Sequence, residues 1–261
     1  MKPGSEAVSP KKTAATRWSD LCKDPTSDLS LSRRLISLEA ASIGSMIRDR
    51  NDYICTLATK KDVLDVGVVS HSLESTVSDS WLHGRLHRSS NRCLGVDILE
   101  PEVAVLRQRG FDVLCADLTA NPLDESFDLI VCGEVLEHLP APQLMLASLS
   151  QMLRTEGRIV VTVPNPWYVN TVLKNVFGRR TYVDNVDHVC WFDAGTIAEL
   201  AERCGLTLLK FQGVFNKAES IHHSRTLKAR MFFSMESILV ALGVNPLVFA
   251  KTILYELGLP K

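Results

Sequence analysis

The stretch Val63-Leu64-Asp65-Val66-Gly67-Val68-Val69-Ser70-His71 decides how the rest of the sequence is interpreted. It is an almost unbroken apolar run, as expected of a parallel strand that helices cover on both faces. The run closes on an acid, a glycine and small residues, where a strand would turn into a helix. A glycine there lets the backbone turn tightly and approach a ligand in the crevice at the carboxyl edge of an open α/β sheet. We therefore expect a ligand-binding loop directly after this strand.

The loop is short of glycine. A loop that binds a dinucleotide or nucleoside usually carries two or three glycines, and here Val69 and His71 occupy positions where the others would be expected. Gly67 alone is a weak signal, so the identity of the ligand depends on the strands that follow.

Apolar segments and helical segments alternate after the first strand. The interval from Gly67 to Asp97 suits a turn, a crossover helix and a return strand, which form one βαβ unit. The repeated pattern predicts an α/β fold with a doubly wound, mostly parallel Rossmann-like sheet and helices on both faces. The expected strands are 63–69, 93–98, 113–118, 127–132, 157–163 and 206–213, and the expected helices are 31–53, 72–87, 101–109, one that runs on from 133–139 to 153, and 196–204. The segment 247–255 fits a strand or a helix equally well.

The pattern predicts a single domain behind a flexible tail. Residues 1–30 mix Pro, Ser, Lys, Thr and Asp without periodicity, as mobile tails do. Residues 165–189 break the alternation after a strand, and such a loop at the carboxyl edge would lie over the ligand as a lid. The expected parts of the domain 31–261 are a helical extension 31–59, a ligand-binding core 60–213 that contains the lid, and a C-terminal segment 214–261.

Composition excludes several classes of protein. Apolar residues make up 46% of the 261 residues, charged residues make up 23%, and the net charge is −1. These values are ordinary for a globular protein and provide no global field that would attract nucleic acid, so we expect no nucleic-acid partner. The oligomeric state stays open.

The seven cysteines are scattered and include no CxxC pair. This pattern argues against a disulfide framework and against a zinc site, and we expect no metal. The N-terminus lacks the apolar core of a signal peptide, and polar residues interrupt the longest apolar region, 231–257, so no transmembrane segment is expected. A reducing cytoplasm is the simplest setting.

Three of the expected strands end in acids, namely Asp65, Asp97 and Asp117. All three would lie at one edge of the sheet, where an unpaired carboxylate is costly. The second is placed to accept hydrogen bonds from a ribose diol, and the third to meet an adenine amino group. Any one of them could instead cap the helix that follows. Three at matching positions favour a nucleoside site.

With these acids, the sequence resembles the class I S-adenosylmethionine-dependent methyltransferases, which have a seven-stranded sheet. It is most similar to their small-molecule branch, which includes quinone and sugar O-methyltransferases. The resemblance covers about residues 60 to 213. The segments that carry it are Val63-Leu64-Asp65-Val66-Gly67, Gly95-Val96-Asp97, Ala116-Asp117-Leu118, Phe127-Asp128-Leu129-Ile130, Glu134-Val135-Leu136-Glu137-His138-Leu139 and Asp187-His188-Val189-Cys190-Trp191-Phe192.

The resemblance implies S-adenosylmethionine as cofactor and assigns residues to each part of it. The sequence departs from the family at the missing glycines. Val69 still serves if only its backbone N–H is needed, whereas its side chain would narrow the pocket. The implied contacts are Asp65 and Gly67 with the methionine part, in a loop shared with Val69 and His71, Asp97 and its neighbour Ile98 with the ribose, Asp117 and Leu118 with the adenine, and Gly133 and Glu134 with the sulfonium side.

Methyl transfer from a sulfonium is an in-line displacement, so the protein chiefly orients the acceptor and keeps the site dry. A hydroxyl acceptor also benefits from a base, for which histidine is suited. His138 and His188 lie on the correct edge and are the candidate catalytic residues, although either could be a structural histidine. Glu137 is expected to face solvent or to cap a helix, and Trp191 and Phe192 are expected in the core.

We therefore predict a methyltransferase that acts on a small molecule, at a hydroxyl oxygen. Two other functions fit less well. A catalytically silent S-adenosylmethionine-binding module would explain Val69 and His71. An NAD(P)-dependent oxidoreductase is disfavoured, because a pyrophosphate must sit tightly on a glycine-rich loop and helix N-terminus, whereas the methionine of S-adenosylmethionine carries no phosphate.

Overall fold

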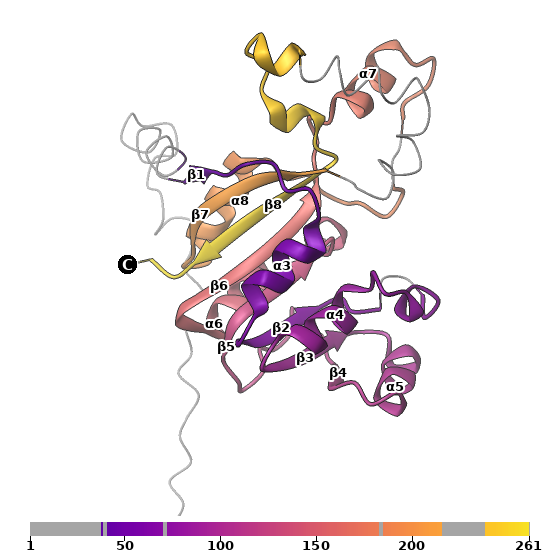
Figure 1. Cartoon of the computed structure of the whole chain (residues 1–261), viewed down its shortest axis with the longest axis vertical. Helices are drawn as coiled ribbons and strands as arrows, with labels where there is room; N and C mark the ends of the chain where they lie inside the picture. Colours follow the sequence, from indigo (N-terminus) through magenta and orange to yellow (C-terminus); the bar gives the residue numbers. More distant parts are fainter. Residues whose placement is uncertain (1–37, 39–40, 70–71, 183–184, 216–237, 261) are drawn as a thin grey trace, which may run out of the picture.

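A computed structural model describes residue 38 and residues 41–69, 72–182, 185–215 and 238–260. The expected tail 1–30 and the candidate residue His71 lie outside these ranges. The described chain forms one eight-stranded sheet with helices on both faces (Figure 1). The strands are β1 (Ser42–Ile43), β2 (Asp62–Val66), β3 (Arg92–Asp97), β4 (Val113–Cys115), β5 (Phe127–Gly133), β6 (Leu153–Pro164), β7 (Thr207–Val214) and β8 (Thr252–Gly258). The helices are α3 (Arg50–Ala58), α4 (Leu82–Ser89), α5 (Glu100–Gln108), α6 (Pro142–Gln151), α7 (Val169–Phe177) and α8 (Ala194–Arg203), with short 3₁₀ helices η1 (Ser75–Val77), η2 (Leu136–His138) and η3 (Pro246–Phe249).

The strand order β1-β7-β8-β6-β5-β2-β3-β4 confirms the predicted doubly wound α/β fold. All neighbours pair in parallel except β8, which runs antiparallel to β6 and β7. The chain proceeds outward from β2 to β3 and β4, then returns to place β5 on the other side of β2. The carboxyl ends of β2 and β5 therefore flank the point where the winding reverses, which is where open α/β sheets bind ligands.

Alternate side chains of the central strands pack against different helices. Along β5, Ile130 lies in the core with α6 and α8, whereas Leu129 and Val131 lie in the core with α3 and α4. Successive strand residues point to opposite faces, so both faces must be apolar, which is why these strands read as continuous Val, Leu and Ile runs. The two cores hold the central strand ends in fixed positions.

A buried polar contact anchors α3 to the sheet. The Tyr53 hydroxyl donates a hydrogen bond to Glu256 Oε1 (2.5 Å), and Arg158 contacts the same carboxylate. Glu256 is fully buried in β8, so these partners satisfy a charge that would otherwise be costly. At the start of α3, the Asp49 side chain caps the helix by accepting from the Asp52 amide (3.0 Å). The helix is thereby fixed with its first residues at the carboxyl edge of the sheet.

The predicted helix over 31–53 is wrong over residues 41–49, whereas residue 38 and residues 50–53 are helical. Ser42 and Ile43 instead pair with β7, Ile47 forms a bridge to Val214, and the helix starts only at Arg50. The apolar spacing here serves an edge strand and a turn rather than a helix face, because pairing with the edge of β7 satisfies backbone groups that a helix would satisfy internally.

Other boundaries also differ from the sequence prediction. The strand predicted to end at Val69 ends at Val66, because Gly67 turns the chain away with φ +80°. Where one helix was predicted over 72–87, the chain first forms a 3₁₀ turn, and the α-helix begins only at Leu82. The helix expected to reach residue 153 is split into η2 and α6, and α6 begins at Pro142, a residue favoured in a first turn.

The irregular lid expected at 165–189 contains a helix, α7, and the strand predicted at 113–118 stops at Cys115. The ambiguous segment 247–255 divides into the 3₁₀ helix η3 and the start of β8. Because β8 lies between β6 and β7, the core extends beyond the boundary expected at residue 213. No helix in the described ranges has the length and apolarity needed to cross a bilayer.

Candidate active site

Gly67 and Gly133 mark the carboxyl ends of β2 and β5 at the reversal point. A Cβ atom on Gly67 would lie 2.7 Å from a methyl group of Val135, and the positive φ strains any other residue. The Gly67 amide donates to the Val96 carbonyl (2.8 Å), which fixes the turn against β3. A cavity of about 220 Å³ opens here, and the residues that line it include Arg50, Asp65, Gly67, Trp81, His83 and Gly133.

Asp65 is buried and lines this cavity, with its Oδ2 atom 3.1 Å from Nδ1 of His83. His83 is itself buried at the start of α4, and its Nε2 atom has no protein partner. This histidine holds the strand-end carboxylate in one orientation. Sequence reasoning missed His83, since a lone histidine in a helical segment carries no specific signal.

Asp97, at the end of β3, accepts three backbone hydrogen bonds. Its Oδ1 atom accepts from the amides of Ile98 (2.8 Å) and Leu99 (3.2 Å), and its Oδ2 atom accepts from the amide of Val69 (2.9 Å). The carboxylate therefore stays at the sheet edge and fixes the loop after β2. Ile98 is 69% exposed, and neither Asp97 nor Ile98 lines the cavity at Gly67, so their assignment to the ribose stays a prediction.

Val69, which stands where a glycine was expected, does not line the cavity, whereas the neighbouring Val68 does. Val68 and Val69 pack into a third core cluster with Trp81, Val103 and Leu106, and the Trp81 indole N–H donates to the Val68 carbonyl (2.8 Å). The side chain of Val69 is fully buried in that cluster, while its amide faces Asp97. At these positions the loop has apolar packing in place of the backbone flexibility that glycine would give.

The residues expected at the adenine lie differently. The Asp117 carboxylate accepts hydrogen bonds from the Thr119 hydroxyl (2.6 Å) and amide (2.8 Å), which lower its pKa. It thus closes a turn of its own chain. Leu118 is buried in the main core. Neither residue lines the cavity at Gly67, so their assignment to the adenine stays a prediction.

Glu134 follows β5 and has a positive φ of 56°, which is unusual for a residue with a side chain. Its amide donates to the Thr162 carbonyl (2.8 Å), and its Oε1 atom lies 3.8 Å from a guanidinium nitrogen of Arg50. Burial raises the pKa of the Glu134 carboxyl, and Arg50 opposes that rise. Arg50, which sequence reasoning missed, therefore borders both the cavity and Glu134.

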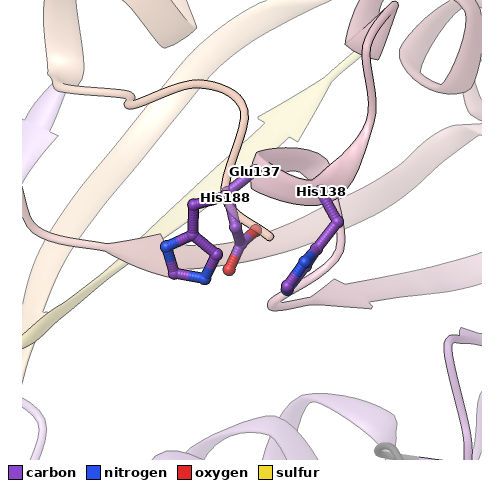
Figure 2. A group of neighbouring side chains, drawn as sticks. All are labelled: Glu137, His138 and His188. Atoms are coloured by element: carbon purple, nitrogen blue, oxygen red, sulfur yellow. The ribbon is translucent and has the colours of Figure 1, made fainter. Parts of the chain in front are cut away.

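Glu137, His138 and His188 form a second group at this edge, and Figure 2 shows the Glu137 carboxylate between the two imidazoles. One potential ligand atom from each residue lies within 4.8 Å of the others. The two rings meet edge to face with centroids 4.8 Å apart, and Asp187 Oδ2 lies 3.3 Å from Nδ1 of His138. The structure thus brings together both candidate catalytic histidines.

The prediction that Glu137 faces solvent or caps a helix is wrong. It is 1% exposed, and neither carboxylate oxygen has a hydrogen-bond partner among the residues that the structure describes. Its backbone carbonyl accepts from the Val189 amide (2.8 Å), which attaches the lid to η2. Burial, together with the nearby charge of Glu134, raises the pKa of Glu137 to about 8. In the sequence, the signal that Glu137 belongs to the site was its spacing from Glu134 and His138.

This raised pKa predicts how stability depends on pH. The protonated carboxyl is favoured in the folded state, so its stabilisation is complete below pH 4.5 and is lost as the pH rises through about 8. We therefore expect Glu137→Gln to become more stable relative to wild type as the pH rises. The free energy of unfolding of the variant minus that of wild type should be on the order of 2–4 kcal/mol larger at pH 9 than at pH 4.5. Urea unfolding at both pH values measures this, and parallel pH profiles would contradict it.

Of the two aromatic residues expected in the core, Phe192 is buried, but Trp191 is 45% exposed and packs edge to face on the His188 ring (5.8 Å). A larger cavity of about 650 Å³ extends along α8 from Trp191 to Arg203. None of the expected site residues lines it. The strand-end cavity and the Glu137, His138 and His188 group therefore define the candidate site.

The donor set of this group, one carboxylate and two imidazoles, is one that binds divalent transition metals. The sequence prediction of no metal rested on cysteine spacing, which does not bear on such a set. In the parts of the chain that the structure describes, these three residues could hold a cation together, and both oxygens of the buried Glu137 carboxylate lack a hydrogen-bond partner.

Comparisons with known proteins agree with this architecture. A sequence profile of the methyltransferase domain family matches residues 43–210. The ubiquinone biosynthesis O-methyltransferase of Coxiella burnetii is 27% identical over 167 residues, which cover 59% of this chain and 67% of that protein. The protein of the same name from Cupriavidus pinatubonensis is 25% identical over 180 residues, which cover 66% and 70%.

Solved structures share the fold. The magnesium protoporphyrin IX methyltransferase of Synechocystis PCC 6803 superposes with a TM-score of 0.53 at 13% identity and covers 93% of both chains. The CcbJ methyltransferase of Streptomyces caelestis superposes with a TM-score of 0.54 at 12% identity, over 82% of this chain and 89% of that one. At these identities the likeness concerns the sheet and its helices.

Proposed function

We propose that this chain, which belongs to the class I S-adenosylmethionine-dependent methyltransferases, transfers the methyl group to a hydroxyl oxygen of a small molecule. One observation carries the proposal. The strand-end cavity and the Glu137, His138 and His188 group share one edge of the sheet, and Glu134 lies between them, near Arg50 on one side and electrostatically coupled to Glu137 on the other. The O-methyltransferase names of the curated relatives support an oxygen acceptor.

The residues around the cavity suit the amino-acid end of the cofactor. Arg50 and Asp65 both line the cavity and carry opposite charges, as a ligand with a carboxylate and an ammonium requires. The positive φ of Gly67 brings backbone rather than side chain to the cavity wall. Asp97 would accept hydrogen bonds from the ribose hydroxyls. The bound cofactor supplies the electrophilic methyl group, and these residues fix its orientation.

On the acceptor side, the chain must hold the hydroxyl in line and remove its proton. His138 is the base in this proposal, because Asp187 lies against its Nδ1 atom and would orient the ring for proton transfer. His188 and the lid residues around it would exclude water. Trp191, half exposed beside His188, offers an apolar surface for the acceptor.

A second mechanism is favoured by the unpartnered oxygens of Glu137. A divalent cation held by Glu137, His138 and His188 would lower the pKa of a hydroxyl bound to it, and no protein base would be needed. Assays after dialysis against EDTA, then with Mg²⁺, Mn²⁺ or Zn²⁺ restored, separate the two. Full activity in EDTA supports His138 as base, whereas activity that returns only with a cation supports the metal.

The proposal is tested by two measurements. Calorimetry with S-adenosylhomocysteine checks the cofactor site, and transfer of labelled methyl groups to a panel of phenols and sugars checks the reaction. Binding without transfer to any acceptor would favour the catalytically silent module instead.

The six described cysteines are unpaired, which supports the cytoplasmic location expected from the sequence.

Arg50→Gln is expected to weaken S-adenosylhomocysteine binding about 10- to 100-fold, because a charge-assisted hydrogen bond to a carboxylate contributes roughly 1.5–3 kcal/mol. Arg48→Gln is the matched control, since Arg48 is exposed and does not line the cavity. Its affinity is expected within twofold of wild type. Equal affinities of the two variants in calorimetry would remove Arg50 from the site.

A further inference from the structure

Helix α7 projects from the carboxyl end of β6 with its apolar side uncovered. None of its nine residues is buried. Leu173, Val176 and Phe177 have the i, i+3 and i+4 spacing that places side chains on one helix face, and Val176 and Phe177 are 65% and 78% exposed. Trp167, just before the helix, is also exposed. Helices of globular domains normally bury such a face against the core.

A second segment continues this surface. Ile238 and Leu242 are exposed and lie one turn apart, since the Leu242 amide donates to the Ile238 carbonyl (3.0 Å). The chain then passes through Val244 to η3, which contacts α7. In Figure 1 both segments lie together at one end of the molecule, beyond the strands. We call the exposed apolar residues of α7 and 238–244, with Trp167, the apical surface.

The charged residues within the two segments that form the apical surface have one sign, and the nearest acids in the sequence, Asp184 and Glu236, lie just outside them. The segments 165–182 and 238–251 contain no Asp or Glu, and they carry Lys174, Arg179, Arg180 and Lys251. The whole chain has a net charge of −1, so these cations are a local concentration rather than a general property. An occupant of this surface must therefore be apolar where it meets the helix face and anionic around it.

We propose that the apical surface docks on the surface of an anionic lipid bilayer. Amphipathic helices that lie in the membrane interface combine an apolar face rich in Trp, Phe and Leu with flanking Lys and Arg. Trp167 and Phe177 stand at the two ends of α7, and Arg179 and Arg180 follow directly. Interfacial docking needs no spanning helix. It goes beyond methyl transfer and does not depend on it.

Docking would also orient the candidate site. The segment 165–189 starts where β6 ends and returns to His188, so the apical surface and the Glu137, His138 and His188 group belong to the same edge of the sheet. A bilayer held against α7 would therefore lie on the acceptor side of the molecule rather than on the side of the strand beginnings.

Sedimentation of the full chain with vesicles tests the proposal. We expect binding to vesicles of phosphatidylcholine with 30% phosphatidylglycerol to be at least tenfold stronger than to phosphatidylcholine alone, and to weaken in 0.5 M NaCl. The double variant Val176→Glu and Phe177→Glu should lose at least 90% of this binding. Leu144→Glu, which adds one glutamate at an exposed leucine of α6, should retain it.

Circular dichroism melting of each variant verifies that the fold is intact. Absence of binding to either vesicle by the wild type, or equal binding by the double variant, would overturn the proposal. So would a concentration-dependent dimer in light scattering that the double variant abolishes, because the apical surface would then meet a second copy. The reverse-charge variant Arg179→Glu with Arg180→Glu should reduce anionic binding at least tenfold and leave the weaker neutral binding unchanged.

Discussion

Replacing Asp97 with alanine is expected to weaken S-adenosylhomocysteine binding at least 100-fold. The carboxylate sits at the end of β3 and would accept two hydrogen bonds from the ribose, and their loss amounts to about 3 kcal/mol. The variant also removes the acceptor for the amides of Val69, Ile98 and Leu99, so the loop beside the cofactor loses its anchor. Calorimetry measures the change directly.

Asp112→Ala is the control for this variant. Asp112 is exposed before β4, at the opposite edge of the sheet, and its side chain contacts Arg92. Its affinity should stay within twofold of wild type. Wild-type affinity in Asp97→Ala would place the ribose elsewhere, and a loss in both variants would point to a folding defect, which the far-UV spectrum would reveal.

His138→Gln is expected to lower kcat about 10²- to 10⁴-fold while the affinity for S-adenosylhomocysteine changes less than threefold. In the proposed mechanism the imidazole would act on the acceptor proton and not on the cofactor, and general-base catalysis contributes a factor of this size. Single-turnover methyl transfer and calorimetry on the same preparation separate the two effects. His87→Gln, an exposed histidine of α4, should behave as wild type.

A parallel loss of cofactor binding in His138→Gln would contradict this assignment. The cation mechanism gives a different pattern. There, Glu137→Gln and His188→Gln would lose activity to a similar extent as His138→Gln, and wild type in EDTA would match all three.

The sheet was predictable because its strands bury both faces. Runs such as 129–132 and 159–161 are apolar throughout because they pack against helices on either side, and that constraint can be recognised in a single sequence. The segment 31–53 is not subject to this constraint. Its apolar residues suit a helix locally, but Ser42 and Ile43 pair with the edge of β7, which depends on tertiary structure, and the local Asp49 cap starts α3 only at Arg50.

The candidate site was only partly predictable, for a related reason. Strand ends place Asp65 and Asp97 at the edge whatever the loops do. Asp117 differs because Thr119, two residues away, supplies local donors that turn its carboxylate back on the chain. Glu137 was misjudged because glutamate is rarely buried without a partner, and functional sites are where such rules fail. Arg50 became relevant only through the placement of α3.

The position of β8 also bears on how the protein is made. During synthesis β6 and β7 leave the ribosome before β8. They do not pair with each other, and Ile159 of β6 can pair with Leu257 only after β8 has been made. Two long apolar strands therefore expose unpaired edges in the nascent chain, a state that favours aggregation and chaperone binding. Productive folding therefore depends on β8, which is synthesised last and inserts between β6 and β7.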